Sequence, residues 1–315
     1  MINISLVGLI EMDFASAKGY IFEKIVWDLL SENGYIKIES GYLSGRGAKH
    51  QIDTYGLLSY PTAFVYPIRL LAESKCSKDK IELPVARNFL GVIKDISENY
   101  VIGKKGGRNT PYRYTDMGCI FSASPFVLSA QNYAWAHNIS LISFSNIEEM
   151  DRVIQEIDKF LNAYRKKIPP IKRLLSDFKE QKTRFKQISP ELRVGIINNS
   201  YPVILVGKTG WGTRLPISNE DDLIDGIKIQ RKDSKLSIRF DLEIGGNSVY
   251  FNIPISIGKK LIKRIDKTRP GEKAFELDMP IIIKPNKQSV RRILRIPITI
   301  PEVFKSKQKP RNKSV

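Results

Sequence analysis

Asp53, Glu73 and Lys75 are the residues whose types and spacing could do chemistry. Asp53 lies in a strand-like stretch, and a Glu-Ser-Lys tripeptide ends the next such stretch. If the two strands pair as a hairpin, two carboxylates and an ammonium group meet at one point. Because side chains repeat every two residues on a strand, Glu73 and Lys75 should share one face and Ser74 should point away.

Such a group suits a hard divalent cation. Two carboxylates, the backbone carbonyl of Ser74 and water molecules offer the oxygen ligands that Mg²⁺ prefers, and Mn²⁺ is expected to substitute. Lys75 could orient the attacking water and help to deprotonate it. The chemistry expected of this site is therefore phosphodiester hydrolysis.

The elements that must position these residues follow from the apolar periodicity. An amphipathic helix is expected at residues 15–30, stopped by Asn33-Gly34. A second helix is expected after Pro84, and the segment Gly118–Phe144 reads as strand, helix, strand, which implies a parallel crossover. Three strands are expected between the two helices, at Tyr35–Gly41, His50–Leu58 and Ala63–Glu73.

These residues and their order resemble the PD-(D/E)xK nuclease superfamily, and within it the Mrr-like restriction endonuclease domain. The resemblance covers about residues 11–145. It lies in four segments: Gly19-Tyr20-Ile21-Phe22-Glu23, Gly45-Arg46-Gly47-Ala48-Lys49-His50-Gln51-Ile52-Asp53, Ala72-Glu73-Ser74-Lys75 and Ser129-Ala130-Gln131-Asn132-Tyr133-Ala134. Any one Glu-x-Lys is common, so the specificity lies in its placement among helices and strands.

The resemblance implies an α/β fold, a restriction-endonuclease-like mixed sheet flanked by helices, and metal-dependent DNA cleavage. It would make Asp53 and Glu73 metal ligands and Lys75 the catalytic lysine, while Glu23 matches the helix-borne acid that completes the metal site in many members. Gln51 precedes Asp53 by two residues and could replace a polar group of the site. Gln131 could support the site or DNA.

The rest of the chain has a different pattern. Residues 146–189 are expected to form a basic helical connector. Residues 190–304 alternate apolar and polar side chains with period two, which predicts a mostly β domain for DNA binding or sensing, and residues 305–315 form a basic tail too polar to pack. The sheet domain before them would span residues 1–145.

The chain is strongly basic, with a net charge of +18. Residues 190–315 contain 25 Lys and Arg against 13 Asp and Glu, so the C-terminal part should supply most phosphate contacts. A solvated basic surface is the alternative. The candidate DNA contacts are Lys104, Lys105 and Arg108 in a Gly-rich loop, Lys259, Lys260, Lys263 and Arg264 in a short helix, and Arg291, Arg292 and Arg295 before a strand.

Other classes of protein are disfavoured. Two cysteines and two histidines argue against a disulfide framework or a zinc site, and no apolar run reaches the roughly 20 residues of a membrane span. We therefore expect a cytoplasmic protein with no membrane partner.

The leading hypothesis is a Mg²⁺-dependent DNA endonuclease, plausibly a restriction or phage-defence effector. Cleavage of both strands needs two active sites, which favours a homodimer or a multi-protein defence complex. Two alternatives stay open: a non-catalytic nucleic-acid-binding or assembly subunit on a nuclease scaffold, and an RNA-cleaving version of the same site.

Overall fold

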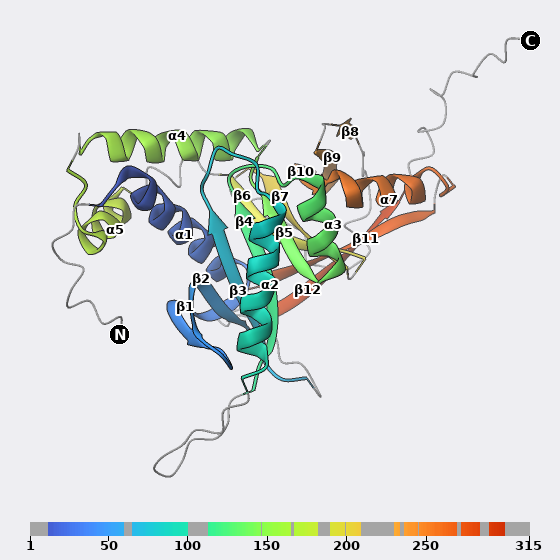
Figure 1. Cartoon of the computed structure of the whole chain (residues 1–315). Coiled ribbons are helices and arrows are strands. Elements are labelled where there is room, and N and C mark those ends of the chain that lie inside the picture. The colour runs from blue at the N-terminus through green and yellow to red at the C-terminus, as the bar shows by residue number, and fades with distance from the viewer. Residues whose placement is uncertain are drawn as a thin grey trace, which may run out of the picture.

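The computed structural model contains two β-sheets and the helices that cover them (Figure 1). The residues that the structure describes are 12–59, 65–99, 113–145, 147–164, 167–181, 190–198, 200–208, 230–233, 236–244, 246–269, 272–283 and 290–299. Within these ranges no helix is both long and apolar enough to cross a membrane.

The first sheet is mixed and five-stranded, in the order β1-β2-β3-β4-β5. The first three strands are antiparallel neighbours, and β3, β4 and β5 run parallel. The strands are β1 (Tyr35–Ser44), β2 (Lys49–Leu58), β3 (Ile68–Lys75), β4 (Thr115–Ser122) and β5 (Ile139–Ser143). The expected mixed sheet is therefore confirmed.

Helices cover both faces of this sheet. The helix α1 (Phe14–Glu32) packs on one face, and α2 (Leu83–Ser97) and α3 (Leu128–Ala136) pack on the other. Asp13 caps α1 by accepting a hydrogen bond from the Ser16 amide at 2.8 Å, and Gly34 follows it with a φ of +89°, which a side chain would disfavour. The connector helices α4 (Glu148–Asn162) and α5 (Ile171–Glu180) pack beside α1.

One expected strand begins later than its apolar run suggested. Val65 and Tyr66 are 49% and 51% exposed, and β3 starts at Ile68. Pro67, directly before it, has no N–H for a strand ladder, so the strand cannot extend back through this position.

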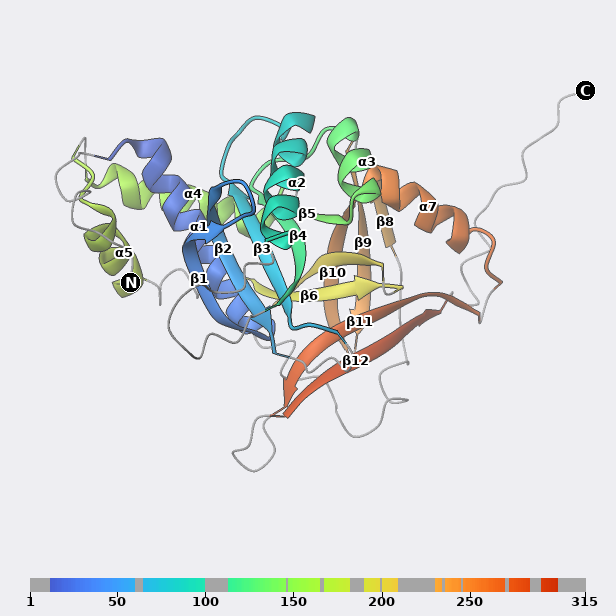
Figure 2. The same ribbon diagram turned by 60° about the horizontal axis from the view of Figure 1, so that its bottom comes forward.

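The second sheet is antiparallel and seven-stranded, in the order β12-β11-β6-β7-β10-β9-β8, which confirms a mostly β C-terminal region (Figure 2). The helix α7 (Ile255–Ile265) covers its apolar face, where Ile257 and Leu261 are buried. The strands are β6 (Glu191–Ile197), β7 (Tyr201–Gly207), β8 (Gln230–Asp233), β9 (Ser237–Ile244), β10 (Asn247–Pro254), β11 (Lys273–Ile283) and β12 (Val290–Thr299).

The two sheets share a core through β7. Val203 and Leu205 pack under α7, whereas Ile204 and Val206 pack into the cluster that also holds α1, α4 and the inner face of the first sheet. Asn33, at the end of α1, hydrogen-bonds the backbone of β6, donating to the Leu192 carbonyl and accepting from the Val194 amide at 2.7 Å. The second sheet therefore completes the burial of the first.

Candidate active site

Glu73 and Lys75 form an ion pair at the carboxyl end of β3, with Nζ of Lys75 2.6 Å from Oε1 of Glu73. This contact confirms that they share a strand face. The Ser74 Oγ between them is buried and has no hydrogen-bond partner among the described residues. Both charged side chains keep some exposure, 38% for Lys75 and 22% for Glu73, so the pair lies at the surface end of a buried strand.

Asp53 lies beside this pair, next to a β-bulge in β2. Between the pairs Glu39↔Tyr55 and Gly41↔Ile52, β2 advances by three residues while β1 advances by two. Ile52 and Tyr55 consequently pack in the same apolar cluster, although strict alternation would place them on opposite faces. The bulge lies where β2 and β3 stop pairing. There, Oδ2 of Asp53 accepts a hydrogen bond from the Ser74 amide at 2.8 Å, in the place of a backbone carbonyl of β2.

Glu23, on α1, completes the group. Its pKa is raised to about 8, first by burial and then by the negative charges of Asp53 and Glu73, against the lowering effect of Lys75. The pKa of Asp53 is raised to about 6, first by burial and then by Glu73, against the lowering effect of the Ser74 amide. These couplings show that the three carboxylates lie within electrostatic reach of one another.

Lys75 is the cation that acts on Glu23 and Asp53 in the described structure. Burial by itself would lower its pKa, but the hydrogen bond with Glu73 and the charges of Asp53 and Glu23 raise it above the usual range. Lys75 therefore stays an ammonium near neutral pH. It can orient or neutralise a charged group, and acting as a base would first require the loss of its proton.

The oxygen atoms of this group are of the kind that a hard divalent cation takes as ligands. Glu23 keeps its proton near neutral pH, first because it is buried and then because Asp53 and Glu73 add negative charge nearby. Since the N–H and C=O of one strand residue point to the same side, the Ser74 carbonyl points toward Asp53 together with the Ser74 amide. Within the described ranges no three His, Cys, Asp or Glu side chains are close enough together to hold a metal ion. Mg²⁺ commonly takes one or two carboxylates, with other oxygen ligands around it.

Gln51 does not join this group in the described structure. Its side chain is exposed, and its strand position pairs with Tyr42 of β1. The expectation assumed regular alternation from Gln51 to Asp53, and the bulge that begins after Ile52 breaks this alternation.

Asp95, on α2, is a structural residue that the sequence reasoning missed. Its carboxylate accepts the amides of Gly47 and Ala48 at 2.8 and 3.2 Å and contacts Nε2 of His50 at 2.7 Å. The hydrogen bond with His50 is the main cause that lowers the pKa of Asp95. A Cβ on Gly45 would lie 1.9 Å from Oδ2 of Asp95, so the turn before β2 needs glycine there. The glycines around an exposed Arg46 were the available signal.

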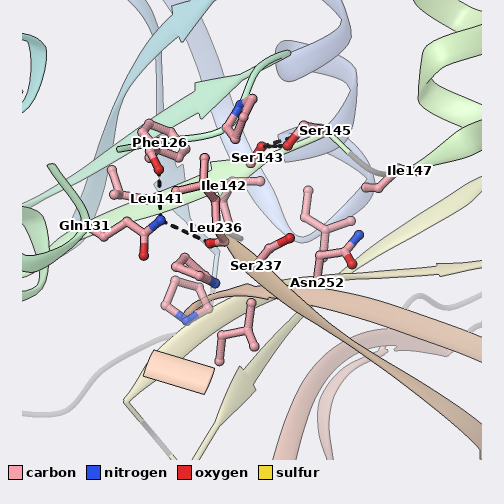
Figure 3. Close-up of a pocket in the computed structure, with 15 residues that line it drawn as sticks. Phe126, Gln131, Leu141, Ile142, Ser143, Ser145, Ile147, Leu236, Ser237 and Asn252 are labelled. Atoms are coloured by element: carbon pink, nitrogen blue, oxygen red, sulfur yellow. Dashed lines mark hydrogen bonds between the residues drawn. The ribbon is translucent and has the colours of Figure 1, made fainter. Parts of the chain in front are cut away.

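Gln131 links the two sheets and lies away from the carboxylates. It is 3% exposed, and its Nε2 donates to the carbonyls of Phe126 and Leu236 at 2.8 and 3.1 Å (Figure 3). Its Oε1 accepts the Ser256 hydroxyl at 3.1 Å. Apolar side chains and Ser143, Ser145 and Asn252 surround it in a small pocket between the sheets.

The candidate DNA contacts lie in three different parts of the chain. Lys104, Lys105 and Arg108 lie outside the described residues. Arg291, Arg292 and Arg295 lie on β12, where only the backbone register is described. Lys259, Lys260, Lys263 and Arg264 lie on α7 and are all exposed.

Comparisons with known proteins give little beyond this geometry. No protein-family model and no curated protein matches the chain. The chain is similar to a crystal structure of a protein of unknown function, AF1548, with 16% identity and a TM-score of 0.33 over 53% of this chain and 98% of that one.

Proposed function

We propose that the chain is a metal-dependent DNA endonuclease that hydrolyses phosphodiester bonds at Asp53, Glu73 and Lys75. The observation that carries the proposal is the grouping of Asp53, Glu73 and Lys75 at the end of β3, with Glu23 of α1 within electrostatic reach. Burying like charges together opposes folding, so a purely structural site has no use for this arrangement.

Each residue has a role in this proposal. Asp53, Glu73 and the Ser74 carbonyl would hold Mg²⁺, and Glu23 would complete the site. When bound, Mg²⁺ supplies a polarised phosphoryl group and a water of lowered pKa. Lys75 keeps its proton and would hold the attacking water or the phosphate charge through its ammonium group.

The choice of DNA, and of a restriction or phage-defence role, rests on the resemblance to Mrr-like nucleases and on the net charge of +18. Cutting both strands of a duplex would need two such sites, so the proposal includes a homodimer or a larger defence complex in the cytoplasm.

The test is parallel digestion of duplex DNA, single-stranded DNA and RNA in Mg²⁺, Mn²⁺ or EDTA. The variants are Asp53→Asn, Glu73→Gln and Lys75→Met. Glu98→Gln is the matched control, because Glu98 is an exposed carboxylate whose contact with Arg46 spans 3.6 Å at the surface. We expect metal-dependent cleavage of duplex DNA that the three site variants lose and the control keeps.

Other outcomes have defined meanings. Cleavage that survives both EDTA and Asp53→Asn contradicts the proposal, and cleavage of RNA alone favours the RNA-directed alternative. Calorimetric titration with Mn²⁺ addresses the non-catalytic alternative: a scaffold would bind no ion at a site that depends on Asp53 and Glu73.

A further inference from the structure

The helix α7 presents a row of exposed cations. Lys259, Lys260, Lys263 and Arg264 are exposed, and Lys267 and Arg269 continue the row just beyond the helix end. The helix itself contains no acidic residue, and none of these six cations forms an ion pair with another residue that the structure describes.

The row is held on a rigid support. Ile257 and Leu261 bury the opposite side of α7 against the second sheet. Gly258 allows this close approach, because a Cβ there would lie 2.6 Å from Cδ1 of Ile238. At the start of the helix, the Ser256 hydroxyl donates to Gln131 of α3. The helix that carries the cations is therefore fixed relative to both sheets.

An exposed aromatic side chain lies beside the row. Trp135, on α3, is 37% exposed, and Nζ of Lys260 lies 5.3 Å from the centre of its ring. Helices α2, α3 and α7 lie side by side in Figures 1 and 2, and the contacts of α3 with α2 and α7 agree. The row thus borders the helical layer of the first sheet.

The charge density of the row matches a duplex better than a single strand. Four cations lie between Lys259 and Arg264, a stretch of about 9 Å of helix axis, or about one cation per 2 Å. Double-stranded DNA carries one negative charge per about 1.7 Å of its axis, and one of its strands carries half of that density.

We propose that the exposed face of α7, together with Trp135, binds the phosphate backbone of duplex DNA without reading its sequence. This inference rests on the proposed function, because it names the surface that holds the duplex for the same enzyme. Phosphate contacts from Arg and Lys fix the position of a duplex and carry no sequence information directly. A basic face that merely keeps the protein in solution is the competing explanation.

The experiment measures duplex DNA binding by fluorescence anisotropy across a salt series, in EDTA, with the full-length chain. The test variant replaces Lys259, Lys263 and Arg264 with Gln. The control variant replaces Lys167, Lys172 and Lys179, which are exposed in and beside α5, so its net charge changes by the same amount.

We expect the test variant to lower the slope of log K against log salt by about 2.7, or about 0.9 per lost phosphate contact, and to bind at least about 10-fold more weakly near 0.1 M salt. The control should keep the wild-type slope. Equal losses in both variants, or no loss in the test variant, would overturn the proposal. A larger effect on single-stranded DNA or RNA than on duplex DNA would also overturn it.

Trp135 provides an independent readout. Binding of duplex DNA should change the tryptophan fluorescence of the wild type, and Trp135→Phe should remove this change. A fluorescence change that persists in Trp135→Phe contradicts the placement of the duplex. Since all binding is measured in EDTA, loss of α7-dependent binding and absence of cleavage in Mg²⁺ are separate results, and either proposal can fail alone.

Discussion

Asp95 and Asp53 both bind the backbone of the first sheet, but their surroundings differ sharply. Asp95 receives two backbone amides and His50, and its pKa is lowered. Asp53 receives one amide and lies near two other carboxylates, and its pKa is raised to about 6. The first carboxylate stabilises the β1–β2 turn in its charged form, whereas the charged form of the second opposes folding.

The difference separates two uses of the same side chain. A carboxylate whose oxygens already accept several hydrogen bonds needs no bound cation, and removing it should destabilise the fold. A carboxylate crowded by like charges gains from a cation, and removing it should damage function while sparing the fold.

The largest effect expected from this contrast is on catalysis. Asp53→Asn should lower DNA cleavage by about 10³-fold or more, because it removes a charged ligand, while Asp95→Asn should stay within about 10-fold of the wild type. Initial rates on a supercoiled plasmid measure both. Comparable losses of cleavage rate in the two variants would contradict the distinction between a functional Asp53 and a structural Asp95.

Gln131 is a second side chain with its hydrogen-bonding groups satisfied. It tests whether such a residue contributes to the stability of the fold. Gln131→Leu leaves the Leu236 carbonyl and the Ser256 hydroxyl without their buried partner, which should cost about 2 kcal/mol. Thermal unfolding should show a Tm about 4 °C lower. An unchanged Tm would mean that this link between the sheets adds no stability.

Asp95→Asn should lower Tm by a few degrees, because a neutral amide oxygen replaces a carboxylate that accepts three hydrogen bonds. Differential scanning calorimetry at pH 7 measures the change. His50→Gln serves as the companion variant, since it removes a single partner of Asp95 and should have the smaller effect. A larger decrease in Tm for His50→Gln than for Asp95→Asn would mean that His50 stabilises the fold through contacts other than the one with Asp95.

Glu23 should also make the stability of the chain depend on pH. Its pKa is about 8 in the folded chain, compared with an ordinary value of 4.5. As the pH rises, the unfolded chain therefore loses this proton at a lower pH than the folded chain does. Stability from this group is therefore fully present below pH 4.5 and declines as pH rises toward 8. In EDTA, Glu23→Gln should show a flatter Tm profile than the wild type over this range. Parallel profiles would contradict the raised pKa.

The sequence predicted the pairing of Glu73 with Lys75 because a strand places every second side chain on one face. It also placed Asp53 beside this pair. It could not place Gln51, since the bulge between Ile52 and Tyr55 depends on the register with β1, which local pattern does not encode. The position of Gln131 was likewise set by a contact with a residue 125 positions away.

One signal for the shared core was present in the sequence. Val203, Ile204, Leu205 and Val206 form an unbroken apolar run, which is typical of a strand buried on both faces. The structure shows β7 in this position, between α7 and the core of the first sheet. The counts of charged residues separate an N-terminal from a C-terminal region, but they cannot show that one strand contributes side chains to the cores of both.

The shared strand has a consequence for biosynthesis. Ribosomes release the chain from its N-terminus, so Glu23, Asp53, Glu73 and Lys75 emerge well before β7. Until Ile204 and Val206 arrive, the inner face beneath α1 lacks part of its apolar cover. A nascent chain therefore carries every candidate catalytic residue before it can hold them in place. Under the proposed function, cleavage would begin only after about two thirds of the chain has been translated.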